Sequence, residues 1–171
     1  GSMELEYGGR EITLTRSTRT ASAPMREFRA VYTGTAEPVP GLTGATAGET
    51  LAPEVFRRFT ERTGITLREG YGQTETTLLA ANFSYGEAVA GSMGTPSPQY
   101  NVELRGRDGR PVPPGEAGEV VVVPENGSRP TGIFMAYLDA PEQYSRVWRG
   151  GVYHTGDAAY MDENGRFWFC G

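Results

Sequence analysis

The sequence predicts a β-rich α+β fold. The expected parts are a remnant of an α/β subdomain, with one clear helix over residues 52–64, and then a small antiparallel β-barrel or sandwich. Glycine (24) and proline (12) together make up about a fifth of the 171 residues, which favours many short strands joined by tight turns. Several short segments alternate apolar and polar residues, as half-buried strands do. Only residues 52–64 show sustained helical spacing.

The N-terminal residues 4–43 are expected to form a β-hairpin-like segment of uncertain origin, after an expression scar at residues 1–3. Residues 10–17 place Ile12 and Leu14 on the same side of a strand, and residues 27–34 alternate in the same manner. The polar stretch that connects these two predicted strands is long for a hairpin loop.

Residues 44–90 are interpreted as the partial α/β subdomain, and they contain the predicted helix. Pro53 suits the first turn of a helix, and Gly64 suits the position after its last turn. The apolar stripe of the helix consists of Val55, Phe56 and Phe59. Residues 65–70 follow as a strand, and residues 76–83 are expected to form a strand or a short helix.

Residues 91–171 are expected to form the small barrel-like subdomain. Strands are predicted at residues 101–105 and 119–123, around a tight turn at Asp108-Gly109. Residues 131–157 are expected to contain a strand, a short helix and a further strand. The last hairpin is predicted to turn at Asn164-Gly165.

Composition restricts the classes of function. The net charge of −5 argues against a general nucleic-acid surface, which would be basic. No apolar run approaches the roughly 20 residues that a membrane-spanning helix needs, so no membrane partner is expected. The single cysteine, Cys170, cannot form an internal disulfide, which fits the cytoplasm. One cysteine and one histidine, His154, cannot build a zinc site of the usual kind.

Two stretches combine residue types that carry chemistry. Residues 69–77 read EGYGQTETT, and residues 153–157 read YHTGD. Each offers glycine beside hydroxyl groups and a carboxylate, which suits close approach to a polar ligand. For either stretch taken alone, a plain turn at the end of a strand is the preferred interpretation, so the assignment depends on their context.

Six motifs occur in one order along the chain: AGETL, GITLREGYGQTETT, GSMGTPSP, VPPGEAGEVVV, GIFMAYLDAPE and YHTGDAAYMDENGRFWFCG. In this order they resemble the adenylate-forming superfamily of acyl-CoA synthetases, peptide-synthetase adenylation domains and luciferases. Within it the sequence is most similar to medium-chain acyl-CoA synthetases. The resemblance covers about residues 44–171.

The resemblance implies an ATP-dependent ligase that binds a small-molecule carboxylate and a nucleotide. Such enzymes form an acyl-adenylate and pyrophosphate with the help of Mg²⁺, and then transfer the acyl group to the thiol of coenzyme A. It further implies that Tyr71 stacks on the adenine and that Asp157 binds the ribose hydroxyls. Thr74 would bind the phosphate of the adenylate, and Glu75 would ligate Mg²⁺. The implied cofactor-binding residues are Gly70, Tyr71, Gly72, Gln73, Thr74 and Asp157, the implied catalytic residues are Thr74 and Glu75, and the implied metal ligand is Glu75. Glycines at 70 and 72 would let the backbone approach the ligand.

The sequence also departs from the family pattern. It has no phosphate-binding loop rich in Gly, Ser and Thr that ends in lysine, because all 16 basic residues are arginines. The family continues after FCG with a hinge and a small domain that carries a catalytic lysine. We therefore expect a fragment of a synthetase with an incomplete active site and one wall of a nucleotide cleft.

The alternative is a recombined or truncated β-rich module that binds no specific ligand and self-associates through exposed strand edges. Residues 4–43 are left outside the family resemblance, and YGGREITLTRS is loosely similar to strands in the heads of chromosome-maintenance-type repair ATPases.

Overall fold

The computed structural model describes residues 2–7, 9–16, 28–35, 37, 39, 41–48 and 51–171. The chain forms two compact units. The first contains residues 1–44 and 54–67, and the second contains residues 45–53 and 68–171. No helix in the described part of the chain is both long and apolar enough to cross a membrane.

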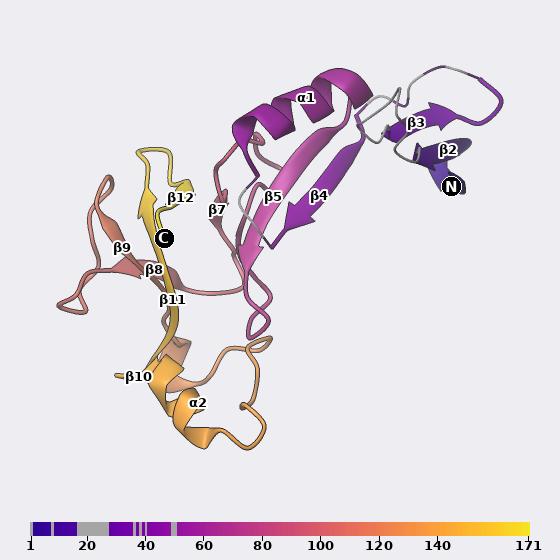
Figure 1. Cartoon of the computed structure of the whole chain (residues 1–171). Coiled ribbons are helices and arrows are strands. Elements are labelled where there is room, and N and C mark those ends of the chain that lie inside the picture. Colours follow the sequence, from indigo (N-terminus) through magenta and orange to yellow (C-terminus); the bar gives the residue numbers. More distant parts are fainter. Residues whose placement is uncertain are drawn as a thin grey trace, which may run out of the picture. The chain divides into compact units, whose positions relative to one another are not determined.

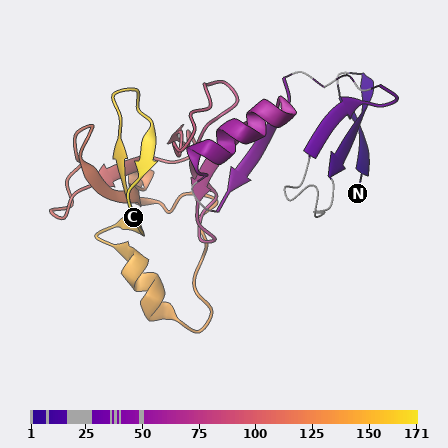
Figure 2. The same ribbon diagram turned by 45° about the horizontal axis from the view of Figure 1, so that its top comes forward.

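The first unit contains a three-stranded antiparallel sheet in the order β1-β2-β3 (Figure 2). Its strands are β1 (Ser2–Tyr7), β2 (Arg10–Arg16) and β3 (Phe28–Tyr32). The pairing of β2 with β3 confirms the predicted hairpin, whereas β1 includes residues that were interpreted as an expression scar. The predicted polar loop between β2 and β3 lies outside the described residues.

The helix α1 (Pro53–Thr63) confirms the predicted helix to within one residue at each end. Glu54 in its first turn pairs with Arg57 and Arg58, which adds support along the exposed side of the helix. The helix ends at Gly64, whose φ of 69° is a conformation that glycine adopts without strain. The amide of Gly64 donates to the carbonyl of Thr60 and completes the last turn.

A second sheet has the order β4-β5-β6-β7, and Figure 1 labels β4, β5 and β7. Its strands are β4 (Thr43–Ala47), β5 (Thr66–Gly72), β6 (Leu78–Ala81) and β7 (Thr95–Pro96). β6 pairs antiparallel with both β5 and β7. Of the two alternatives left open for residues 76–83, the strand is therefore correct.

The third sheet has the order β10-β11-β9-β8, and β12 pairs with β11. Its strands are β8 (Val102–Arg105), β9 (Ala117–Val122), β10 (Trp148–Arg149), β11 (Val152–Met161) and β12 (Phe167–Phe169). A 3₁₀ turn (Glu125–Gly127) and the helix α2 (Pro141–Val147) lie between β9 and β10. The turn at Asp108-Gly109 is confirmed by the bridge between Arg105 and Pro111 and by the hydrogen bond from Gly109 to Gly106. The turn at Asn164-Gly165 is confirmed by the pairing of β11 with β12.

The predicted antiparallel strands form here as one sheet, and within the described residues no strand ladder joins β8 to β10, so this sheet does not close into a barrel. One prediction for this region is wrong, because no strand precedes α2 in residues 131–140. The amide of Phe134 donates instead to the carbonyl of Glu75, 2.8 Å away, so this segment is tied to the β5–β6 turn. Gly132 (φ 93°) and Asp139 (φ 53°) further interrupt extended backbone there.

The core of the second unit connects β6 with β9 and β11. One cluster of buried residues consists of Ala80, Met93, Leu104, Val120, Ala159 and Phe167. The other consists of Leu79, Tyr100, Val122, Ile133 and Tyr153. Because neighbouring residues of β6 enter both clusters, the end of β5 and the β5–β6 turn are held against β11. Burial of this apolar surface therefore brings residues 69–77 next to residues 153–157.

Candidate functional site

The two predicted motifs meet at the carboxylate of Asp157. The Tyr71 hydroxyl donates to Asp157 Oδ2 over 2.6 Å, and Gln73 Nε2 donates to the same oxygen over 2.8 Å. Asp157 Oδ1 receives no hydrogen bond from the residues that the structure describes. One oxygen of this carboxylate therefore holds its own side chain in place, and the other keeps its acceptor capacity for a ligand.

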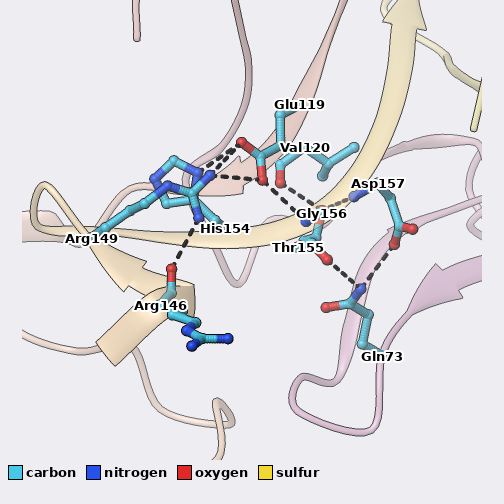
Figure 3. A network of polar contacts seen from close by, with 9 residues as sticks. All are labelled: Gln73, Glu119, Val120, Arg146, Arg149, His154, Thr155, Gly156 and Asp157. Atoms are coloured by element: carbon cyan, nitrogen blue, oxygen red, sulfur yellow. Dashed lines mark hydrogen bonds and ion pairs between the residues drawn. The ribbon is translucent and has the colours of Figure 1, made fainter. Parts of the chain in front are cut away.

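The amide of Gln73 makes hydrogen bonds through both its nitrogen and its oxygen, and Figure 3 shows those of the nitrogen. Its Nε2 also donates to the carbonyl of Thr155 over 2.9 Å, and its Oε1 accepts from the Tyr153 hydroxyl over 2.9 Å. Tyr153 is only 1% exposed, and burial raises its pKa, so its hydroxyl remains a donor at neutral pH. These partners determine the orientation of the amide, with its nitrogen toward Asp157 and Thr155 and its oxygen toward Tyr153.

A cavity of about 320 Å³ lies beside this contact. Its lining consists of Gly48, Glu69, Gly70, Tyr71, Gly72, Met93, Asp157 and Phe169. The cavity thus combines two aromatic rings, a thioether and backbone glycines with two carboxyl groups. Burial, followed by the hydrogen bond to Asp157, raises the pKa of Tyr71 and keeps its hydroxyl protonated.

Glu69 also lines the cavity, although it was not among the predicted binding residues. Its side chain is buried, with 7% exposed, and its Oε1 accepts from the amide of Leu51 over 3.1 Å. Burial raises its pKa, and the bond from Leu51 opposes that effect. The contact ties residues 51–53 to the end of β5. An acidic residue directly before Gly70-Tyr71-Gly72 was the signal in the sequence that could have identified it.

Thr74 and Glu75 lie outside the cavity lining. Thr74 is exposed in the turn after β5, and Glu75 Oε1 accepts from the Tyr137 hydroxyl over 2.8 Å. In the described part of the chain no group of three His, Cys, Asp or Glu side chains could hold a metal ion. A single carboxylate nevertheless fits Mg²⁺, which commonly takes one or two carboxylates and fills its remaining positions with phosphate oxygens and water.

The glycines at 70 and 72 have a structural role as well. A Cβ at Gly72 would overlap the carbonyl oxygen of Thr77, and a Cβ at Gly70 would lie 2.7 Å from Leu78 Cδ2. The turn between β5 and β6 therefore requires glycine at position 72 whether or not a ligand approaches.

Of the predicted binding residues, the structure thus brings together Gly70, Tyr71, Gly72, Gln73 and Asp157. Thr74 and Glu75 lie at the adjoining turn. Sequence reasoning missed Tyr153, Thr155 and Tyr137, whose hydroxyl or carbonyl groups hold these side chains. Tyr153 and Thr155 are in the YHTGD motif itself, and their alternation with Asp157 along a strand was the available signal.

Comparisons with known proteins agree with these motifs. The family model described as AMP-binding enzyme matches residues 13–137. This match begins well before residue 44, so it includes most of residues 4–43, which the motifs alone left outside the family. The similarity of YGGREITLTRS to repair ATPases is not confirmed.

Two curated relatives illustrate the similarity. Acyl-coenzyme A synthetase ACSM3, mitochondrial, from Rattus norvegicus is 46% identical over 125 residues, which are 72% of this chain and 21% of the relative. The 4-hydroxybutyrate–CoA ligase 1 of Metallosphaera sedula is 40% identical over 126 residues, which are 73% of this chain and 22% of the relative. The chain spans about a fifth of the length of the curated relatives that it matches.

Solved structures show the same similarity. The anthranilate CoA ligase AuaEII in complex with anthranoyl-AMP matches with a TM-score of 0.66 and 27% identity, over 75% of this chain and 24% of the ligase. A benzoate CoA ligase from Burkholderia xenovorans LB400 matches with a TM-score of 0.65 and 30% identity, over 76% of this chain and 25% of that one. With the family model matching most of its length, the chain belongs to the AMP-binding enzyme family.

Proposed function

We propose that this chain carries the nucleotide side of an ATP-dependent acyl-CoA synthetase and binds the AMP part of an acyl-adenylate. The observation that supports this most directly is the contact of Tyr71 with Asp157 at the wall of the 320 Å³ cavity. An aromatic ring and a carboxylate with one unused oxygen suit a base and a pair of ribose hydroxyls. The similarity to several CoA ligases supports the same assignment.

The reaction proposed for the whole enzyme has two steps. A carboxylate oxygen of the substrate attacks the α-phosphorus of ATP, and the bond to pyrophosphate breaks. The thiol of coenzyme A then attacks the acyl carbon, and AMP leaves. In this scheme Thr74 would bind the phosphate, and Glu75 would hold Mg²⁺, which would neutralise charge on the phosphates.

In-line transfer at phosphorus depends on positioning and on neutralisation of charge more than on covalent help. The chain has no lysine to supply that charge. We also expect it to supply one wall of the nucleotide cleft, whereas ligand sites normally bury most of their ligand. We therefore expect binding of the adenylate without efficient turnover by this chain alone.

Calorimetric titration with a non-hydrolysable acyl-adenylate mimic tests the proposal. Saturable binding that Asp157→Ala abolishes is expected, whereas Glu163→Gln should leave it unchanged, because Glu163 is exposed in the β11–β12 turn. Binding that survives Asp157→Ala, or no binding by the unaltered chain, would contradict it. Titration with ATP tests Glu75 separately, since Glu75→Gln should remove the enhancement by Mg²⁺ but leave the binding of AMP unchanged.

Two other expectations stay predictions. Self-association through strand edges would appear as a concentration-dependent sedimentation coefficient. A cytoplasmic location was expected from the cysteine content, but several of the matched relatives carry the word mitochondrial in their names, so localisation needs imaging of the tagged protein.

A further inference from the structure

Strand β11 contains an irregularity at the position of Asp157. Along the β9–β11 ladder His154 pairs with Val121, and the next paired residue is Ala158, opposite Glu119. β9 therefore advances by two residues while β11 advances by four, so β11 carries two extra residues. A regular ladder would place Gly156 opposite Glu119 and Asp157 opposite Gly118. The bulge instead takes Asp157 out of the ladder, and the conformation of Gly156 (φ 80°) makes this possible.

The carboxylate of Glu119 holds the bulge from the neighbouring strand (Figure 3). Its Oε1 accepts from the amide of Gly156 over 3.1 Å, and its Oε2 lies 2.8 Å from His154 Nδ1. The Arg149 guanidinium pairs with the same carboxylate over 3.1 Å and also donates to the carbonyl of Arg146 at the end of α2. The side chain of Glu119 on β9 thus contacts His154, before the two extra residues of β11, and Gly156, within the bulge.

Thr155 completes the connection from β9 to Asp157. Its hydroxyl donates to the carbonyl of Val120 over 2.7 Å and accepts from the amide of Asp157 over 3.1 Å. The carbonyl of Thr155 also accepts from Gln73 Nε2, which in turn donates to Asp157 Oδ2. The bulge therefore fixes the backbone position of Asp157. Through the carbonyl of Thr155 it also holds Gln73, which is a hydrogen-bond partner of the Asp157 side chain.

We propose that Glu119 is a positioning residue that directs Asp157 into the cavity by holding this bulge. The consequence for the ligand rests on the proposed function, in which Asp157 binds the ribose hydroxyls. Glu119 does not line the cavity, so it acts through Gly156 and the backbone of β11 and does not contact the nucleotide.

The position requires a carboxylate. Three donors converge on Glu119, and a carboxylate accepts from all of them, whereas glutamine would turn its NH₂ group toward one of them. Burial raises the pKa of Glu119, but the hydrogen bond from His154 and the charges of His154 and Arg149 outweigh it, so the pKa is lowered overall. Glu119→Gln keeps the volume of the side chain and removes only the negative charge and the ability to accept from all three donors.

The first test follows the side-chain amide of Gln73 by ¹⁵N–¹H NMR in the protein without ligand. Its two protons are assigned from their loss in Gln73→Glu. Glu119→Gln and Glu119→Ala are expected to shift this pair toward the position of a free amide. The matched control is Glu103→Gln, because Glu103 is also paired with an arginine on a strand and has 25% of its side chain exposed, against 28% for Glu119. An unchanged Gln73 signal in both Glu119 variants would overturn the proposal.

The second test compares the affinities for AMP and 2′,3′-dideoxy-AMP. The unaltered chain should prefer AMP by about tenfold or more, the effect of one or two charge-assisted hydrogen bonds. In Glu119→Gln this ratio should fall toward one, mainly through weaker binding of AMP, as in Asp157→Ala. A merely structural role would weaken both ligands equally and keep the ratio, and that result would overturn the proposal. If the unaltered chain binds neither nucleotide, the proposed function fails, and the NMR test still decides whether Glu119 positions Asp157.

Discussion

Replacing Tyr153 by phenylalanine should lower the stability at neutral pH and make it fall less steeply at alkaline pH. The hydroxyl of this buried residue donates to Gln73 Oε1, and without it that oxygen loses the hydrogen bond that holds it. A typical intramolecular hydrogen bond contributes about 0.5–1.5 kcal/mol, and a fully buried acceptor left unsatisfied costs more. Because Gln73 is only partly buried, we expect the free energy of unfolding to fall by about 1 kcal/mol at neutral pH.

The alkaline effect follows from proton linkage. Burial raises the pKa of Tyr153, and the neighbouring Glu75, Tyr137 and Asp157 add to the shift. In the unfolded chain a tyrosine titrates near pH ~10, so above this pH the folded state binds more protons than the unfolded state. The stability due to the protonated hydroxyl is thus fully present below pH ~10 and is lost as the pH rises further, by about 1.4 kcal/mol per pH unit.

Urea unfolding between about pH 8 and about pH 11 measures this slope. Tyr153→Phe should reduce it by about 1.4 kcal/mol per pH unit above pH ~10. Tyr85→Phe is the matched control, because Tyr85 is 75% exposed. Parallel curves for the unaltered chain and Tyr153→Phe would refute the reasoning, since they would mean that the Tyr153 hydroxyl ionises as readily in the folded chain as in the unfolded one.

Three further predictions concern the scaffold of the site. Gly94→Ala should prevent stable folding, because a Cβ there would overlap the backbone of β6. Gly109→Ala is the control, because a Cβ there has open space, and its positive φ should lower the free energy of unfolding by only about 1 kcal/mol. Thermal unfolding of the two variants measures this difference. Phe167→Ala should lower the free energy of unfolding in urea by about 3–5 kcal/mol, because the ring is fully buried. Phe169→Ala should lower it much less, because Phe169 is 43% exposed, and equal losses in the two variants would contradict this packing. Burial alone would raise the pKa of Asp162, but hydrogen bonds from Arg166, Trp168 and Asn164 lower it overall. The contribution of Asp162 to stability is therefore present above pH ~4 and is lost as the pH falls further. Asp162→Asn should make the free energy of unfolding, measured in urea, fall less steeply with decreasing pH below pH ~4.

The best predictions from the sequence depended on signals within a few residues. Pro53 and Gly64 bracket α1, and the Asn164-Gly165 turn fixes the last hairpin. The wrong prediction of a strand before α2 depended on a distant partner. Nothing in residues 131–138 shows that the amide of Phe134 is bound to the carbonyl of Glu75, and this bond removes the expected strand. Alternation along single strands also cannot show whether the two ends of a sheet meet, so the sequence left a barrel and a sandwich open, and the structure shows that the sheet does not close.

The sequence by itself indicated the family and the predicted binding residues Tyr71, Gln73 and Asp157, because they are in motifs that can be read from the chain in order. Only the tertiary structure decided that these residues touch. Tyr71 and Asp157 are separated by 86 positions, and they are brought together by burial of β6 against β9 and β11. The role of Glu119 was equally invisible, because its partners are 30 to 37 positions away and the bulge exists only in the paired strands. Turns and helix ends depend on residues that are neighbours in sequence, whereas the direction in which a side chain points depends on contacts across a packed core.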